Sequence, residues 1–168
     1  MRRCGLNMRS SPEITELFSG LLSREEAGTL SSVRTAGVRP HVCALPAEPE
    51  AYLEGLAREV EQASQAGGLC AIICDDRRRA EWIGRKVEGV TMIGRNDQLP
   101  ASGVVVLDLA LAKGLEFDQV IVADASQEVD PTTPLARRRL YTAISRAMHR
   151  VSVLSQGPLT ELLDFVEA

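Results

Sequence analysis

The sequence has few aromatic residues and almost no lysine, and it lacks the signals of membrane and secreted proteins. Its 168 residues include one tryptophan, two tyrosines and three phenylalanines, so surfaces on which nucleic-acid bases can stack are scarce. No apolar run approaches the roughly 20 residues of a membrane-spanning helix, and no apolar signal segment opens the chain. We therefore expect a globular protein with no membrane partner and with enough apolar residues to bury one core.

The four cysteines, Cys4, Cys43, Cys70 and Cys74, lack the spacing of zinc ligands, and no metal site is expected. Such thiols are typical of a reducing compartment, so we expect a cytoplasmic protein. Cys70 and Cys74 lie four residues apart on a predicted strand, which places both sulfur atoms on one face of the sheet. Core packing is the role that we expect for this pair.

Charge is distributed unevenly along the chain. The net charge of −4 gives no general attraction to nucleic acid, and Lys86 and Lys113 are the only lysines. The segment 131–156 contains no aspartate or glutamate, but it contains five arginines: Arg137, Arg138, Arg139, Arg146 and Arg150. This segment is either a solvated basic face or a phosphate-binding surface, because a guanidinium matches the geometry of phosphate oxygens.

Strand and helix signals alternate along the chain, which predicts an α/β fold with a mostly parallel sheet and helices on both faces. An apolar stripe indicates a helix through Ile14, Leu17, Phe18, Leu21 and Leu22. The run Leu69–Cys74 is typical of a strand covered on both faces, and Asp75 and Asp76 are expected to cap the helix after it. The other expected strands are 38–45, 90–93, 104–107, 120–123 and 151–154, and the other expected helices are 50–65, 135–149 and one from residue 158. We find no repeat, so residues 1–168 are expected to form a single domain.

Two polar segments are candidates for chemistry. The first is the turn Ala112–Asp118 between two buried strands, where Gly114 would let a ligand approach the backbone. Glu116 in this turn can accept a hydrogen bond from a sugar hydroxyl or pair with a neighbouring cation. The second is the helix expected from Leu135 to Arg150, on which a rotation of about 100° per residue places Arg146 beside the buried face. Arg146 is thus expected at a fixed position on a rigid helix.

These segments resemble conserved motifs of superfamily 1 helicases of the UvrD/Rep type. AKGLEFD at 112–118 looks like motif V, LYTAISRAM at 140–148 looks like motif VI, and LNMRSS at 6–11 looks like motif IV. The three motifs occur in the family's order and cover nearly the whole chain. The match is closest in character to the HelD-like branch, whose members act on RNA polymerase. The resemblance implies the C-terminal, or 2A, motor domain, which is a three-layer RecA-like fold.

The resemblance also implies a role for individual residues. Arg146 matches the motif VI arginine that reaches the γ-phosphate of ATP, and Arg9 matches the motif IV arginine that does the same. Gly114 and Glu116 match motif V positions near the ribose and phosphates, and Lys113 belongs to the same turn. Met8 stands where the family usually has a tyrosine that stacks on adenine. The implied cofactor is ATP with Mg²⁺, and the implied partners are an N-terminal RecA-like domain, DNA and, by the HelD-like comparison, RNA polymerase.

The sequence departs from the family in ways that limit the expected activity. Motif V of UvrD-type proteins usually begins with threonine and histidine that touch single-stranded DNA, but Asp108 and Ala110 stand at those positions. The nucleic-acid-binding residues therefore stay unassigned. The chain has no G-x-x-x-x-G-K-[ST] loop, and no apolar strand ends in the Asp-Glu pair of the metal-binding motif. We expect half of an ATP site, in a fragment of a longer protein, and no useful hydrolysis by this chain alone.

Two other readings come from different classes of protein. Asp75 and Asp76 after one strand and Asp108 after another resemble the acidic pocket of a response-regulator receiver, which holds Mg²⁺ beside a phosphoacceptor aspartate. The receiver's late lysine has no counterpart, because no lysine follows Lys113. The third reading is an interaction module that keeps the fold without binding ATP.

Overall fold

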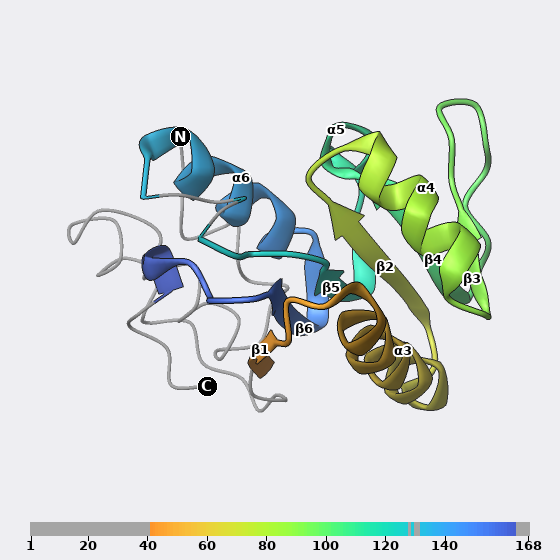
Figure 1. The fold of residues 1–168 in the computed structure, drawn as a ribbon. Coiled ribbons are helices and arrows are strands. Elements are labelled where there is room, and N and C mark those ends of the chain that lie inside the picture. Colours follow the sequence, from red (N-terminus) through yellow and green to blue (C-terminus); the bar gives the residue numbers. More distant parts are fainter. Residues whose placement is uncertain (1–40, 128, 130–131, 164–168) are drawn as a thin grey trace.

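The structure, a computed structural model, describes residues 41–127, 129 and 132–163, and it is built on a six-stranded sheet (Figure 1). The strand order is β1-β6-β5-β2-β4-β3, and every pairing between neighbours is parallel. The strands are β1 (His41–Leu45), β2 (Leu69–Cys74), β3 (Val90–Met92), β4 (Gly103–Asp108), β5 (Phe117–Val122) and β6 (Ala147–Gln156). The helices are α3 (Pro49–Ala66), α4 (Arg77–Lys86), α5 (Leu109–Ala112), α6 (Pro134–Ile144) and the 3₁₀ turn η1 (Glu161–Leu163).

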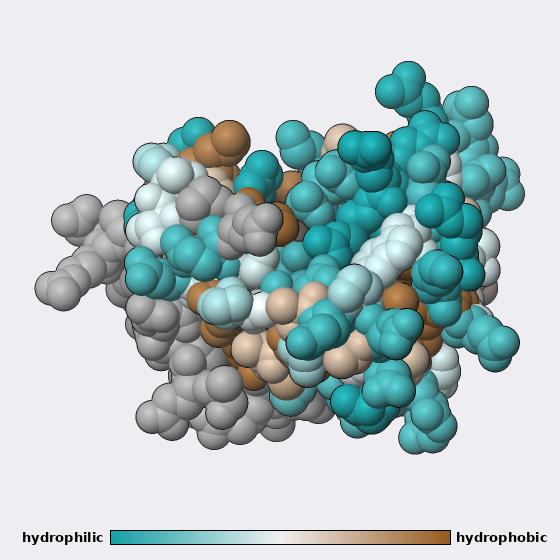
Figure 2. All heavy atoms as spheres, in the orientation of Figure 1, coloured by the Kyte–Doolittle hydropathy of each residue, from teal (hydrophilic) through white to brown (hydrophobic). Residues whose placement is uncertain are grey.

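Helices cover both faces of the sheet, and β2 shows how the core is divided between them (Figure 1). Cys70, Ile72 and Cys74 pack with buried side chains of α3 and α4, whereas the alternate residues of β2 pack with α5 and α6. All six β2 residues are buried, as expected for a strand covered on both faces. The predicted three-layer α/β fold is confirmed. The apolar clusters face inward, and Figure 2 shows mostly hydrophilic residues over α4.

The two cysteines of β2 lie on the same face of the sheet, as their spacing predicts. Burial raises the pKa of both thiols, that of Cys70 to about 12, so both are protonated at neutral pH. They are core residues.

Local sequence explains where the helices begin. Pro49 occupies the first turn of α3, where a missing backbone N–H costs nothing. The side chain of Asp76 accepts a hydrogen bond from the Arg79 backbone N–H at 2.9 Å, which caps α4 as predicted. Thr133 caps α6 in the same way, since its hydroxyl accepts from the Ala136 N–H at 3.1 Å. Within the described residues, none of these helices combines the length and apolar character needed to cross a membrane.

One predicted element is wrong at its end. The helix expected to reach residue 149 stops at Ile144, and β6 begins at Ala147 rather than at residue 151. The backbone tightens after Ile144, where the Arg146 N–H donates to Ala143 O at 3.2 Å, and Ala147 then pairs with Phe117 of β5. Ala147 is buried as a strand residue. Its apolar character therefore fits the helical pattern and the strand equally well.

The strand order excludes the response-regulator reading. A receiver has the strand order 2-1-3-4-5, in which the second and third strands flank the first. In the receiver reading, β2, β3 and β4 would be the first, second and third strands. Here β4 lies between β2 and β3, and β1 adds a sixth strand next to β6. Asp75 and Asp76 are accordingly at the start of α4, and the carboxylate of Asp108 caps α5 by accepting from the Leu111 N–H at 2.9 Å.

Candidate functional site

The turn between α5 and β5 lies at the amino-terminal edge of the sheet. The two strands that flank it in sequence, β4 and β5, are not neighbours, because β2 lies between them. The chain leaves the carboxyl end of β4, forms the short helix α5, and must return to the opposite edge to begin β5 in parallel. Residues 113–116 therefore end beside the amino-terminal starts of β2 and β6, and they do not form a direct connection between paired strands.

Arg146 lies against this turn. The Phe117 N–H donates to Arg146 O at 2.8 Å, and Nη1 of Arg146 lies 3.5 Å from Leu115 O. Nε donates to Thr142 O at 3.2 Å and Nη2 to the Ser145 hydroxyl at 3.0 Å. These contacts fix the half-buried guanidinium. All three acceptors are uncharged, so none of them neutralises its positive charge.

The structure thus joins the two candidate segments but corrects how Arg146 is held. The sequence predicts Arg146 on the helix, beside its buried face. Instead Arg146 follows α6 in a turn, and Arg150 belongs to β6. In this turn the Arg146 carbonyl accepts from the start of β5, and the guanidinium is held by its own three hydrogen bonds.

The other candidate residues of the turn are open to solvent. Lys113, Gly114 and Glu116 are exposed. Gly114 has φ 82°, and a Cβ built on it would meet no atom within 4 Å. The backbone here is therefore accessible to a ligand, and glycine is favoured by the positive φ. Met8 and Arg9, the two candidates from the motif IV segment, lie outside the described residues.

Two polar side chains at the start of β5 tie the turn to its surroundings. Oδ2 of Asp118 accepts a hydrogen bond from the Leu69 N–H at 2.8 Å. Nε2 of Gln119, which is buried, donates to Ala63 O at 3.0 Å and to Gly67 O at 2.8 Å. Sequence reasoning included Asp118 in the candidate turn but gave it no role, and it missed Gln119. The available signal was a pair of polar residues opening an otherwise apolar strand.

The opposite, carboxyl-terminal edge of the sheet carries a buried ion pair that sequence reasoning also missed. Nη2 of Arg79 lies 2.9 Å from Oδ2 of Asp124, whose exposed fraction is only 6%. Oδ1 of Asp124 accepts from the Ser126 and Gln156 N–H groups at 3.0 and 2.9 Å, and Nη1 of Arg79 donates to Gln156 Oε1 at 2.6 Å. The guanidinium also lies 5.6 Å from the Tyr52 ring and 5.5 Å from the Trp82 ring. Its charge is fully engaged.

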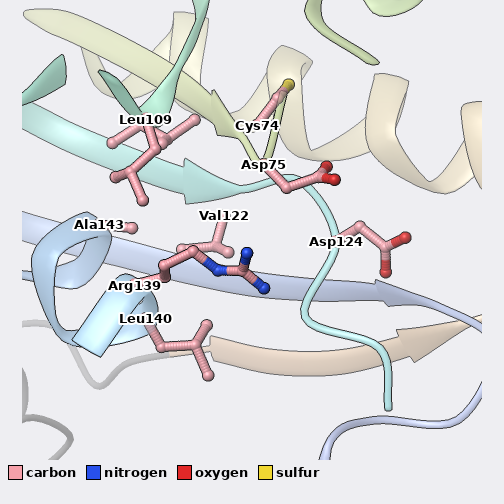
Figure 3. A pocket seen from close by; sticks show the side chains of 9 residues that line it. Cys74, Asp75, Leu109, Val122, Asp124, Arg139, Leu140 and Ala143 are labelled. Carbon is pink, nitrogen blue, oxygen red and sulfur yellow. The ribbon is translucent and has the colours of Figure 1, made fainter. Parts of the chain in front are cut away.

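The cavity beside this pair is small. It holds about 20 Å³ and is lined by residues that include Cys74, Asp75, Asp124, Arg139 and Ala143. Figure 3 shows Arg139 reaching from α6 toward the carboxyl end of β5, where its Nη2 donates to Val129 O at 2.9 Å. The volume suits about one water molecule and no larger ligand. An open hollow of about 510 Å³ lies outside it, lined by Asp75, Asp76, Arg78, Arg79 and Trp82 among others.

The carboxylates at this edge do not form a metal site. Burial raises the pKa of Asp75, and the neighbouring charge of Asp76 raises it further. Within the described ranges, no group of three or more His, Cys, Asp or Glu side chains gathers as metal ligands.

The chain is similar to C-terminal domains of helicases. Residues 103–154 match the family model described as UvrD-like helicase C-terminal domain. The structure resembles the C-terminal domain of a possible DNA helicase from Lactobacillus plantarum WCFS1, with 31% identity and a TM-score of 0.77, over 94% of this chain and 92% of that one. Two structures of the PRRSV helicase nsp10, one of them methylated, have 15% and 13% identity and TM-scores of 0.41 and 0.44. These matches cover 69% and 76% of this chain but only 24% and 29% of the viral ones. No curated protein matches.

Proposed function

This chain belongs to the family of UvrD-like helicase C-terminal domains, and from that premise we propose that it supplies the second half of an ATP site. It is a helicase motor domain with a RecA-like fold. In the proposal, the turn 113–116 and Arg146 face the nucleotide across a cleft whose other wall is an N-terminal RecA-like domain of the same protein. DNA would be the substrate on which the complete motor acts.

The observation that carries the proposal is the contact between Arg146 and the turn. The guanidinium is fixed by Leu115 O, Thr142 O and the Ser145 hydroxyl, and none of these groups cancels its charge. In the part of the chain that the structure describes, this charge is held in place without a carboxylate, which suits it to stabilising the negative charge that develops on a transferred phosphoryl group. An arginine in that role raises the rate by roughly 10³–10⁵-fold.

The other candidates have supporting roles in the same proposal. Glu116 would accept a hydrogen bond from the ribose, and the accessible backbone at Gly114 would lie against the phosphates with Lys113 beside it. Arg9 would be a second arginine toward the γ-phosphate, and Met8 would cover the adenine. The groups that cradle the β-phosphate and hold Mg²⁺ would come from the N-terminal domain, because this sequence has no G-x-x-x-x-G-K-[ST] loop. Residues 1–168 alone would then hydrolyse ATP at no useful rate.

The test is the ATPase activity of the complete protein with Arg146→Ala. We expect the kcat to fall roughly 10³-fold or more, because charge stabilisation is lost in the transition state. Arg138→Ala is the matched control, since Arg138 is an exposed arginine on α6 and its removal changes the net charge equally. Arg9→Ala is expected to lower the kcat as well. An unchanged kcat in Arg146→Ala would show that the proposed site is wrong.

A second candidate is an ATPase that acts on RNA polymerase, as HelD-like proteins do. Asp108 and Ala110 favour it, because they stand where UvrD-type proteins touch single-stranded DNA. The carboxylate of Asp108 is occupied by the Leu111 N–H, and an acid there repels phosphate. The two candidates differ in what stimulates hydrolysis. Single-stranded DNA should raise the ATPase rate of a translocase, whereas RNA polymerase should raise that of a HelD-like protein.

A further inference from the structure

The first residues of β5 are held from both sides, by β6 and by β2. On the β6 side, the Phe117 N–H donates to Arg146 O, and the Arg146 guanidinium reaches Leu115 O. On the β2 side, the carboxylate of Asp118 accepts from the Leu69 N–H at 2.8 Å. Cys70 is paired with Gln119 in the ladder, so Leu69 lies one step before the pairing begins. The Asp118 side chain thus replaces a backbone acceptor at the end of the ladder.

The approach of the two segments at this point leaves no room for a side chain at Gly68. A Cβ built on Gly68 would lie 2.7 Å from Oδ2 of Asp118 and 3.0 Å from its Cβ. Gly68 also has φ 78°, and its carbonyl accepts from the Gly103 N–H at 3.0 Å, which ties the same turn to β4. The position of the Asp118 carboxylate is therefore set by a backbone that is itself fixed in the sheet.

The strand is irregular at Asp118. Phe117 packs in the core under α6, whereas Gln119, two residues later, bonds to the end of α3 on the opposite face. Residues two apart on a regular strand point to the same face, and the β5–β6 ladder does shift register between Phe117 and Gln119. Such irregularities redirect neighbouring side chains and backbone. The direction in which the chain arrives from Glu116 is thus decided at this residue.

We propose that Asp118 is a positioning residue for the nucleotide, and that the Asp118–Leu69 contact sets the place of Leu115 and Glu116. Leu115 holds Arg146 through its carbonyl, and Glu116 is the proposed ribose contact. Asp118 itself does not touch the nucleotide and acts through these two residues. The inference rests on the proposed function.

The kinetic test compares Asp118→Ala with Asp118→Asn in the complete protein. Loss of the acceptor should misplace Glu116, so we expect the kcat/KM for ATP to fall roughly 10- to 100-fold, mainly through a higher KM. Asparagine keeps an oxygen that can accept from the Leu69 N–H, so Asp118→Asn should recover most of the loss. A residue that only stabilises the fold would lower the melting temperature and leave the KM unchanged, and that outcome would overturn the inference.

Two adjacent glycines provide a matched pair of variants. Gly67 and Gly68 both have positive φ, at 84° and 78°, so alanine strains the backbone at either position. A Cβ at Gly67 would meet no atom within 4 Å, whereas one at Gly68 would strike Asp118. We expect Gly68→Ala to raise the KM as Asp118→Ala does, and Gly67→Ala to leave it near the wild-type value. In an Asp118→Ala background, Gly68→Ala should raise the KM by less than it does alone, because the contacts with Oδ2 and Cγ are gone and only the 3.0 Å contact with the Cβ of residue 118 is left. Equal effects at the two glycines would contradict the proposal.

Arg146→Ala separates this inference from the proposed function. If Arg146→Ala lowers the kcat while the Asp118 and Gly68 variants leave the KM unchanged, the positioning role fails and the ATP site stands. If Arg146→Ala has no effect, the proposed function fails. Amide hydrogen exchange of residues 1–168 then tests separately whether the Asp118–Leu69 contact sets the place of residues 115–117. Asp118→Ala should speed amide exchange at Leu115 and Phe117 as well as at Leu69, whereas Gly67→Ala should not. Faster exchange at Leu69 alone would contradict the positioning role.

Discussion

The two edges of the sheet treat their charges in opposite ways. At the carboxyl edge, Arg79 and Asp124 form a buried pair, and three further hydrogen bonds involve Arg79 Nη1 and Asp124 Oδ1. At the amino edge, the guanidinium of Arg146 is held by uncharged oxygens, and Lys113 and Glu116 are exposed. The Arg79–Asp124 pair stabilises the fold. In the proposed function, the Arg146 charge at the second edge would act on a nucleotide.

This difference is the reverse of what is usually expected for the position of a ligand site in an open parallel sheet. Ligands generally bind outside the carboxyl ends of strands where neighbouring connections leave to opposite faces. Here that point lies between β2 and β5, whose connections lead to α4 on one face and α6 on the other. The Arg79–Asp124 pair occupies it. Asp124 lines a cavity of about 20 Å³, and Arg79 lines an open hollow of about 510 Å³. In this domain, strand order alone would favour the carboxyl edge, whereas the proposed nucleotide site lies at the amino edge, where the hydrogen-bond acceptors of the Arg146 guanidinium among the described residues are all uncharged.

The largest effect on stability is expected at the carboxyl edge. Asp124→Ala would leave the Arg79 guanidinium largely buried without its carboxylate, and we expect the free energy of unfolding to fall by about 3–5 kcal/mol. Arg146→Ala should lower it by only about 1 kcal/mol, because it removes hydrogen bonds to uncharged groups at a half-buried position. Urea denaturation of both variants of residues 1–168 measures the contrast.

Asp124→Asn is the control for this contrast. The amide oxygen can still accept from the Ser126 and Gln156 N–H groups, so Asn should cost less than Ala by the value of those two bonds. If Asp124→Ala were no more destabilising than Arg146→Ala, the two edges would not differ in the way described.

A smaller effect is expected from Gly114→Ala at the amino edge. The residue has φ 82° and open space around its Cβ, so alanine should cost about 1 kcal/mol of stability through backbone strain alone. Gly89→Ala is matched to it, because Gly89 has φ 81° and no atom within 4 Å of a Cβ. Both variants should unfold at similar urea concentrations. The ATPase rate of the complete protein should fall with Gly114→Ala alone, and an equal fall with Gly89→Ala would remove Gly114 from the site.

Much of the fold follows from local sequence, and the exceptions have a physical cause. Leu69–Cys74 is a continuous apolar run and forms a strand with the predicted bounds, because a strand covered on both faces has no polar side. The end of α6 was not predictable in this way. Leu140, Ala143 and Ala147 are all buried, and the periodicity of 3.6 residues continues across the junction between helix and strand. Pairing with β5 decides the structure of residue 147, and that is a contact from 30 residues away in the chain.

In the candidate site, too, local motifs could be predicted and contacts between distant parts of the chain could not. Arg146 and the turn 113–116 were found because their local motifs resemble those of a known family, and the structure brings Arg146 into contact with Leu115. The roles of Asp118 and Asp124 were missed, since their partners, Leu69 and Arg79, lie far away in sequence and no spacing rule connects them. An aspartate in the sequence does not reveal whether its carboxylate will hold a turn, pair with a buried arginine or face water. The roles assigned to Arg146, Glu116, Gly114 and Lys113 stay predictions until they are measured.

The smallest expected effect concerns pH and the carboxyl edge. Burial raises the pKa of Asp75, with further contributions from the charges of Asp76 and Asp124, while Arg79 acts in the opposite direction. A carboxyl group whose pKa is higher in the folded state favours folding when it is protonated. Its contribution is therefore complete below its unfolded pKa of about 3.9 and is lost as the pH rises through the folded pKa. Asp75→Asn should make the domain slightly more stable than wild type at pH 7, and the difference should vanish near pH 3.5. Urea midpoints at the two pH values measure it, with Asp97→Asn as a control for an exposed carboxylate in a loop. A variant less stable than wild type at pH 7 would mean that the charge of Asp75 supports the fold, which would contradict this prediction.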